Sequence, residues 1–565
     1  MSERVDYYEK KMNMRPDREQ EPRRKSNAFQ PLLIGLVLIV GIFLGTQLGK
    51  DAQLFDFQPN SGGDADKLLQ VLERIEDNYV DSVDGDDLVE RAIETLLDDL
   101  DPHSYYISPE DFSRMSEQMQ GGFDGIGVEF MIEDDTLVVV NAIDGGPSQR
   151  AGIIAGDRIV LVDDSTITGA DITSEDVMTR LKGRSGSSVK IGVQRPGKAD
   201  LLSFDIERDR IPIYSVVAQY QDGDVGYVKI NQFARTTYEE FRLAVDNLRE
   251  GGTQKLVLDL RGNGGGYLDA ATNIVEEFLD KNELIVFTEG RTQGKRNTYS
   301  SKRGKYREME VTVLMNQSSA SASEVVAGAL QDHDRSITIG RRSFGKGLVQ
   351  HQYEMRDNSA LRITVARYYT PSGRCIQKPY GDGIDYEDDY HQRLESGELM
   401  SADSIEFADS LRFETPGGRI VYGGGGITPD IFIPLDTMRS PLAVELSYLG
   451  AYRSVSLDYY VRNRQAMQQE YPDLISFDTR FDADDALLTA LLDFGREQDP
   501  ELGEPSATDR AEMTARAKAY LAKHLFDESA YYYVLRHRDD DYQKALEVLR
   551  DYSTFFQASL AANRE

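Results

Sequence analysis

Two short apolar runs constrain the fold of this chain more than any other feature, because each leads directly into a turn of small residues and then a helical pattern. Residues 255–260 are the first run and lead into a glycine cluster at 262–266. Residues 311–315 are the second and lead into a serine-rich turn at 316–324. Repeated strand-to-helix units predict an α/β sheet with its site at the carboxyl ends of the strands.

The glycine cluster has two interpretations. A phosphate-binding loop would need the spacing G-x-G-x-x-G, which Gly262, Gly264, Gly265 and Gly266 match only in part. As a wall of an oxyanion hole, the loop would instead turn its backbone N–H groups toward the carbonyl of a reacting peptide bond. The spacing alone leaves both open.

The serine-rich turn is equally ambiguous. Ser321 precedes a helix predicted over residues 325–330, and serine in that position is commonly a helix cap. The free N–H groups and the dipole of the helix would also favour an oxyanion beside a nucleophilic serine. Such a serine needs a base, and no G-x-S-x-G elbow supports a triad with His333 or His351.

Lys346 is the better candidate for the base. Gly345 and Gly347 flank it, and the neighbouring Phe344 and Leu348 are apolar. Burial disfavours the ammonium ion and lowers the lysine pKa, as a lysine base requires. The alternative is an exposed loop lysine. Gln350 could orient the amine only if the two glycines curl the chain, because in a straight strand it would lie about 13 Å away.

The same segment partly matches a nucleotide-binding motif. Residues 340–346 fit the first seven positions of G-x-x-x-x-G-K-[ST], but Gly347 stands where Ser or Thr should bind magnesium. The pattern after it, over residues 348–353, is that of a strand, whereas a phosphate loop opens a helix. The sequence therefore argues against a nucleotide enzyme.

The N-terminal region predicts a membrane anchor. Residues 26–49 contain no charged side chain, and residues 31–48 as a helix would be about 27 Å long, close to the roughly 30 Å of a bilayer core. Basic residues gather before this segment, so the N-terminus is expected in the cytoplasm and the rest outside. A cleaved signal peptide is the alternative, although no A-x-A cleavage site follows.

Composition narrows the function further. The formal net charge of −33 argues against nucleic-acid binding. Cys375 is the single cysteine, so no intrachain disulfide forms, and the six histidines show no metal-ligand spacing. We expect neither a metal nor a cofactor.

A chain of 565 residues is long enough for several domains. The pattern predicts an α/β multi-domain protein with the following parts: a cytoplasmic N-terminus (1–28), a transmembrane signal anchor (29–49), a linker (50–65), a helical segment (66–117), a glycine-punctuated domain of short strands (118–209), an α/β core (210–440) with a polar surface insertion at about 376–420, and a helical C-terminal extension (441–565).

Several motifs together resemble the carboxyl-terminal processing (tail-specific) serine proteases. These are Ala320–Glu324, Phe344–Gln350, Asp259–Gly266, Leu100–Ser104, Thr370–Arg374 and Gly426–Asp430, with Lys346 25 residues after Ser321. The resemblance covers roughly residues 66–435. It implies a crotonase-like sheet, Ser321 as the nucleophile, Lys346 as the base and Gln350 as the residue that positions the lysine.

The resemblance also implies the rest of the site. The oxyanion hole would combine the N–H of Ala322 with an N–H of Gly265 or Gly266. Ser323 is a rival nucleophile, but the spacing to Lys346 and the family pattern favour Ser321, and Ser323 is expected to cap the helix. No cofactor is implied.

Residues 121–208 resemble a PDZ domain. The N–H groups of Ile126, Gly127 and Val128 would hold the carboxylate of a protein C-terminus, and the tail would add to the sheet as a strand. Apolar Ile126, Val128 and Phe130 suggest apolar tails. The alternative is a domain kept only as a structural lid.

We therefore expect an endopeptidase anchored by one segment in a bacterial inner membrane, with its catalytic part in the periplasm or outside the cell. Its partners would be the C-terminal tails of envelope proteins. The resemblance further implies a homo-oligomer and admits a regulatory adaptor. A non-catalytic membrane-anchored PDZ adaptor is the alternative function, and the natural substrates and the role of the C-terminal extension stay open.

Overall fold

The computed structural model describes residues 64–381, 384–386, 388–405, 408–436 and 440–561. The chain divides into two compact units, residues 1–89 and 90–565. The first contains helix α3 (Asp64–Asn78) and the start of α4 (Gly85–Asp98). No helix within the described ranges is long and apolar enough to cross a membrane. The predicted anchor at 29–49 lies outside those ranges.

The α/β core is built on a six-stranded sheet in the order β10-β11-β12-β15-β16-β21. All neighbours are parallel except the antiparallel pair β10–β11. The strands are β10 (Val216–Asp222), β11 (Val225–Ile230), β12 (Lys255–Asp259), β15 (Glu310–Met315), β16 (Ile337–Gly340) and β21 (Ile431–Phe432). The parallel arrangement brings the ends of β12 and β15, and thus both predicted turns, to one edge.

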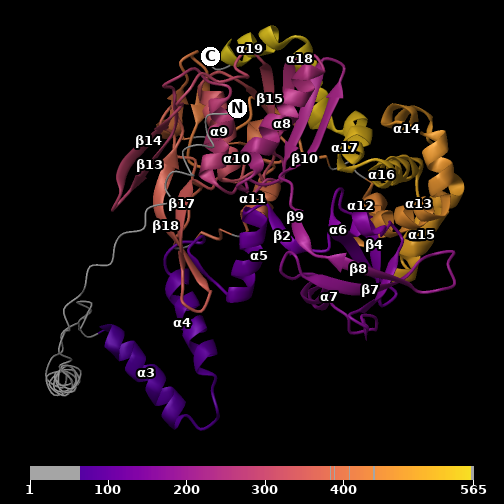
Figure 1. The fold of residues 1–565 in the computed structure, drawn as a ribbon. Coiled ribbons are helices and arrows are strands. Elements are labelled where there is room, and N and C mark those ends of the chain that lie inside the picture. The colour runs from indigo at the N-terminus through magenta and orange to yellow at the C-terminus, as the bar shows by residue number, and fades with distance from the viewer. Residues whose placement is uncertain (1–63, 382–383, 387, 406–407, 437–439, 562–565) are drawn as a thin grey trace, which may run out of the picture. The chain divides into compact units, whose positions relative to one another are not determined.

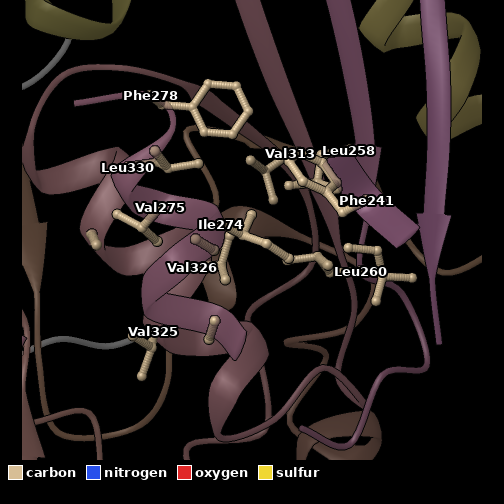
Figure 2. Close-up of a cluster of buried hydrophobic side chains, with 14 of the residues drawn as sticks. Phe241, Leu258, Leu260, Ile274, Val275, Phe278, Val313, Val325, Val326 and Leu330 are labelled. Carbon is tan, nitrogen blue, oxygen red and sulfur yellow. The ribbon is translucent and has the colours of Figure 1, made fainter. Parts of the chain in front are cut away.

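Three helices pack against this sheet through a shared apolar core: α8 (Thr237–Glu250), α9 (Leu268–Glu276) and α10 (Ala322–Asp332). Figure 2 shows Phe241, Ile274, Val326 and Leu330 meeting the strand residues Leu258 and Val313. Every residue of α10 is buried, which fixes the helix that begins directly after Ser321.

A second sheet of the core has the order β1-β18-β13-β14, with β17 paired to β18. Its strands are β1 (Tyr105–Ile107), β13 (Leu284–Gly290), β14 (Gly294–Tyr299), β17 (Leu348–Glu354) and β18 (Ala360–Tyr369). Strand β17 begins two residues after Lys346. The loop of Lys346 therefore ends in a strand, as the sequence predicted, and not in the helix that a phosphate-binding loop requires.

The PDZ-like part has a sheet in the order β3-β4-β5-β7-β8, with β6 paired to β5. Its strands are β3 (Val128–Glu133), β4 (Thr136–Ala142), β5 (Arg158–Val162), β6 (Ser165–Thr166), β7 (Ser188–Gln194) and β8 (Leu202–Glu207). Helices α6 (Pro147–Ala151) and α7 (Ser174–Leu181) complete it, and β2 (Gly122–Gly125) pairs with β9 (Asp209–Pro212) at its boundary with the core. Strand β3 lies at the sheet edge.

Helices dominate the C-terminal extension (Figure 1). They are α12 (Pro441–Tyr448), α13 (Ala451–Glu470), α14 (Leu474–Arg480), α15 (Asp485–Gln498), α16 (Ala507–Leu525), α17 (Glu528–Leu535), α18 (Asp540–Arg550) and α19 (Tyr552–Ala561). Leu457 of α13 packs on Val138 and Val140 of β4. Helix α18 packs against the core sheet. The other α-helices of the described ranges are α5 (Pro109–Met119) and α11 (Asp389–Glu395), and the other strands there are β19 (Arg412–Glu414) and β20 (Ile420–Tyr422).

Candidate active site

Ser321 occupies a strained position at the start of α10. It is the N-cap residue, and its backbone angles, φ 55° and ψ −113°, are ones that residues other than glycine seldom adopt. Such a conformation costs about 1–3 kcal/mol and persists only where neighbours hold it. Its N–H donates to Glu324 Oε2 at 2.7 Å, and the buried Tyr368 hydroxyl donates to its carbonyl at 3.0 Å.

The glycine loop lies directly against Ser321. A Cβ on Gly265 would come within 2.7 Å of the Ser321 Cβ, so only glycine fits there. The N–H of Gly265 donates to Asn263 Oδ1 at 2.8 Å and is thereby engaged. Among the residues that the structure describes, the N–H groups of Gly266 and Ala322 have no acceptor. Of the two predicted glycines, Gly266 is thus the one with a free donor.

Ser323 does not cap the helix, contrary to the sequence-based expectation. It lies inside the first turn of α10, fully buried, and its hydroxyl donates to the carbonyl of Asn263 at 2.9 Å. The cap is Ser321 because the chain turns sharply one residue before Ala322. The hydroxyl of Ser323 instead fastens the glycine loop to the helix.

The loop that carries Lys346 requires glycine at the two positions beside it, 345 and 347. A Cβ on Gly347 would meet the Gln377 nitrogen at 2.8 Å, and one on Gly345 would meet the Gly425–Gly426 backbone at 3.1 Å. Burial, followed by the positive charge of Arg362, lowers the pKa of Lys346 below its ordinary value. The predicted direction of this pKa shift is confirmed, and the exposed-loop alternative is wrong.

A buried carboxylate that sequence reasoning missed joins the two residues. Glu324 is fully buried, and its Oε2 accepts the N–H of Ser321 at 2.7 Å and the N–H of Lys346 at 2.9 Å. Its Oε1 accepts the Ser343 hydroxyl and the N–H of Gly345. Burial raises the pKa of Glu324, and these four hydrogen bonds oppose the rise. The signal was present, because Ser321 and Glu324 have the S-x-x-E spacing of a capping box.

Gln350 contacts another part of the chain. Its side-chain amide donates to the carbonyl of His103, and no hydrogen bond joins it to Lys346 within the described ranges. The loop of His103 is held by Asp101, which accepts the hydroxyls of Ser104 at 2.6 Å and Thr364 at 2.9 Å. Burial, and then the charge of Lys346, lower the pKa of His103 to about 4, so this histidine stays neutral beside the lysine.

The polar segment at 376–420 is more than a surface insertion. The N–H of Lys378 donates to the Gly345 carbonyl at 2.9 Å, and Gln377 Oε1 accepts the N–H of Gly347 at 2.8 Å. The buried Arg393 donates to the carbonyls of Arg342 and Ser343. The polar composition of this segment reflects its buried hydrogen bonds to residues 341–347, which we call the lysine loop, as well as exposure to solvent.

The predicted carboxylate loop of the PDZ-like part has the expected backbone. Gly127 has φ +74°, and the N–H groups of Ile126 and Gly127 have no acceptor within the described part of the chain. Val128 begins the edge strand β3. On that strand, Arg453 of α13 donates to the Phe130 carbonyl at 2.8 Å. The extension therefore occupies one backbone group of the strand to which a tail would add.

Comparison with known proteins gives three matches to family models. Residues 224–388 match peptidase family S41, residues 125–207 match a PDZ domain, and residues 443–527 match a family of unknown function.

Comparison with individual proteins gives similar results. A carboxy-terminal-processing protease of Bartonella bacilliformis is 38% identical over 60% of this chain and 80% of its own length. The carboxy-terminal processing protease CtpB of Bacillus subtilis is 34% identical over 55% of this chain and 65% of its own. A solved photosystem II D1 C-terminal processing protease is 29% identical over 56% of this chain and 91% of its own, with a TM-score of 0.31.

Proposed function

The chain belongs to the carboxy-terminal-processing serine proteases of peptidase family S41, and on that basis we propose that Ser321 and Lys346 form its catalytic dyad. The observation that carries this assignment is the shared carboxylate of Glu324. Because one oxygen accepts both backbone N–H groups, the two residues are held at a fixed separation. A non-catalytic adaptor would leave this arrangement, and the strain at Ser321, without a purpose.

In the proposed reaction, neutral Lys346 takes the proton of the Ser321 hydroxyl as the oxygen attacks a peptide carbonyl. The N–H groups of Ala322 and Gly266 donate to the oxyanion. The protonated lysine then gives its proton to the leaving amine, and an acyl-enzyme remains on Ser321. Lys346 next takes a proton from the water that attacks the acyl-enzyme, and gives this proton to the Ser321 oxygen as its bond to the acyl group breaks, which restores the serine and the neutral lysine.

We propose that the PDZ domain selects substrates by their C-terminal carboxylate. An apolar peptide with a free carboxylate should bind at least about tenfold more tightly than the same peptide with a carboxamide end, because a hydrogen bond to a charged group contributes about 1.5–3 kcal/mol. Fluorescence anisotropy on the Ser321→Ala chain measures this without cleavage. Gly127→Ala should weaken carboxylate binding by a similar factor.

Gly197→Ala is the matched control for that experiment. Both glycines have positive φ, +74° and +80°, but Gly197 lies away from the carboxylate loop with open space around it. Its variant should bind the tail like the parent chain. Equal binding of the two peptides would remove tail capture from the proposal and leave the protease assignment intact.

We further propose that residues 29–49 anchor the protein in a bacterial inner membrane with the catalytic part outside the cytoplasm. The uncharged stretch at 26–49 and the basic residues before it support this. The full-length chain should stay with membranes washed in alkaline carbonate, and protease added to spheroplasts should digest it. Recovery of the chain in the soluble cytoplasmic fraction would contradict this placement.

A further inference from the structure

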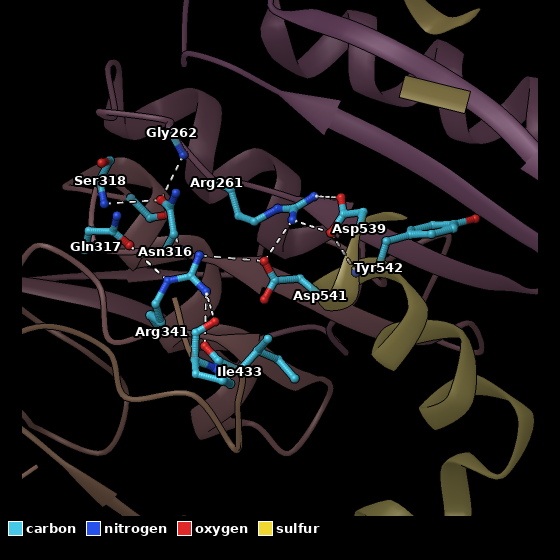
Figure 3. Close-up of polar contacts among 12 residues, drawn as sticks. Arg261, Gly262, Asn316, Gln317, Ser318, Arg341, Ile433, Asp539, Asp541 and Tyr542 are labelled. Atoms are coloured by element: carbon cyan, nitrogen blue, oxygen red, sulfur yellow. Dashed lines mark hydrogen bonds and ion pairs between the residues drawn. The ribbon is translucent and has the colours of Figure 1, made fainter. Parts of the chain in front are cut away.

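The N-cap residue of α18, Asp539, and a residue of its first turn, Asp541, are ion-paired to Arg261, which precedes the glycine loop, and to Arg341, which begins the lysine loop. We propose that Asp539 and Asp541 act as positioning residues, a clamp that holds the glycine loop and the lysine loop in their working arrangement. This inference rests on the proposed function. Figure 3 shows the two carboxylates facing Arg261 and Arg341 of the core.

Arg261 carries the first half of the clamp. It lies at the carboxyl end of β12, immediately before the glycine cluster. Its guanidinium donates to Asp539 Oδ1 and Oδ2 at 2.8 and 2.6 Å, and to Asp541 Oδ2 at 2.9 Å. The fully buried Asp259 accepts its remaining donors. A planar guanidinium saturated in this way fixes the direction in which the loop leaves the strand.

Arg341 carries the second half. It follows β16 and precedes Lys346 by five residues. Asp541 Oδ2, the same atom that accepts from Arg261, pairs with Arg341 at 3.7 Å. Arg341 also donates to Gln317 in the serine-rich turn and to the Ile433 carbonyl. One carboxylate thus links the ends of β12 and β16.

Hydrogen bonds connect the glycine loop, and with it Arg261, to the turn that carries Ser321. Asn316 Oδ1, in the turn before Ser321, accepts the N–H of Gly262 at 3.0 Å. The carbonyl of Asn263 accepts the N–H of Ala320 at 2.9 Å and the Ser323 hydroxyl. A shift of Arg261 would therefore move the oxyanion donors relative to Ser321.

Ion pairs join Asp539 and Asp541 to the two arginines at this point. A pocket of about 800 Å³ lies beside the clamp and is lined by Arg261, Arg341, Asp539 and Asp541, among others. The apolar face of α18 is seated separately, through Tyr542, Ala545, Val548 and Leu549 on the core sheet. Asp539 also caps α18, because its Oδ1 accepts the N–H of Tyr542 at 3.1 Å, and asparagine keeps an oxygen for that bond. Asparagine at 539 and 541 should therefore leave α18 docked while removing the charges that orient the arginines.

The test compares Asp539→Asn/Asp541→Asn with the wild-type full chain. We expect kcat to fall at least about 30-fold, and the rate at which an active-site phosphonate labels Ser321 to fall by the same factor. KM and tail-peptide affinity should stay within about twofold. Asp540→Asn is the matched control, because Asp540 is exposed in the same turn and forms no ion pair with any described residue. It should behave like the wild type.

Amide hydrogen exchange gives a readout that does not depend on cleavage. Exchange should quicken at 261–266 and 341–347 in the double variant and stay unchanged in the PDZ domain. Unchanged exchange, or a lower melting temperature with wild-type kcat, would overturn the clamp. If the double variant does not fold, Asp539→Asn alone decides by the same measures. Failure of the proposed function would be recognised by a different result: the Ser321→Ala variant would cleave as fast as the wild type.

Discussion

Ser321→Ala should abolish cleavage while leaving the fold intact. Removing the nucleophile of a serine protease lowers kcat by about 10⁴-fold or more, since no other group can form the acyl-enzyme. Alanine has the same Cβ and is strained by this backbone about as much as serine is, so the melting temperature should change little. Incubation with a tailed protein, followed by mass spectrometry of the products, measures the loss.

Two serines of the same turn serve as controls for this variant. Ser318 is exposed, and Ser318→Ala should retain wild-type activity. Ser323→Ala removes the hydrogen bond to Asn263 and should lower stability by about 1 kcal/mol, with cleavage reduced but present. If Ser323→Ala abolished cleavage while Ser321→Ala retained it, the nucleophile would have been assigned to the wrong residue.

Lys346→Met should reduce kcat nearly as far, because the variant keeps the apolar stem and loses the amine. Lys346→Arg should be equally inactive, since a guanidinium stays protonated at every usable pH. In the wild type, only the neutral amine acts as a base. kcat/KM should therefore rise with pH to a plateau. The midpoint of the rise should lie below the ordinary lysine pKa of 10.5.

The lowered pKa of Lys346 also makes the stability of the folded state depend on pH. The unfolded chain keeps the ordinary pKa and binds the proton more tightly, so the folded state becomes less stable as the pH falls from 10.5 through the lowered value. Lys346→Met escapes this cost and should melt above the wild type at neutral pH. A flat pH–rate profile, or substantial activity in Lys346→Arg, would exclude Lys346 as the base.

The parts of the site that local sequence could predict are those that local chain geometry determines. The turn before α10 and the two glycines around Lys346 follow from small residues where the backbone must turn or approach closely. The predicted helix at 325–330 was shorter than α10 (Ala322–Asp332), because the small residues of its first turn resemble a loop.

Long-range contacts left no comparable signal. Gln350 meets the carbonyl of His103, which lies 247 positions earlier in the chain, and Asp539 meets Arg261 across 278 positions. No periodicity or spacing encodes such pairs. Glu324 lay between these extremes, since its spacing from Ser321 indicated a cap, but only the fold brings Lys346 to the same oxygen.

If Ser321 and Lys346 form the dyad as proposed, the shared carboxylate of Glu324 should make its assembly cooperative. If the loop of Lys346 moves away, Oε2 loses one of its two hydrogen bonds, and Glu324 holds the strained backbone of Ser321 less firmly. A site in which Ser321 is in place without Lys346 is therefore the least stable arrangement. Each molecule should have either both residues in their working positions or neither. A regulator of this protease would then change the fraction of molecules whose active site is assembled. An intermediate rate of cleavage would report that fraction.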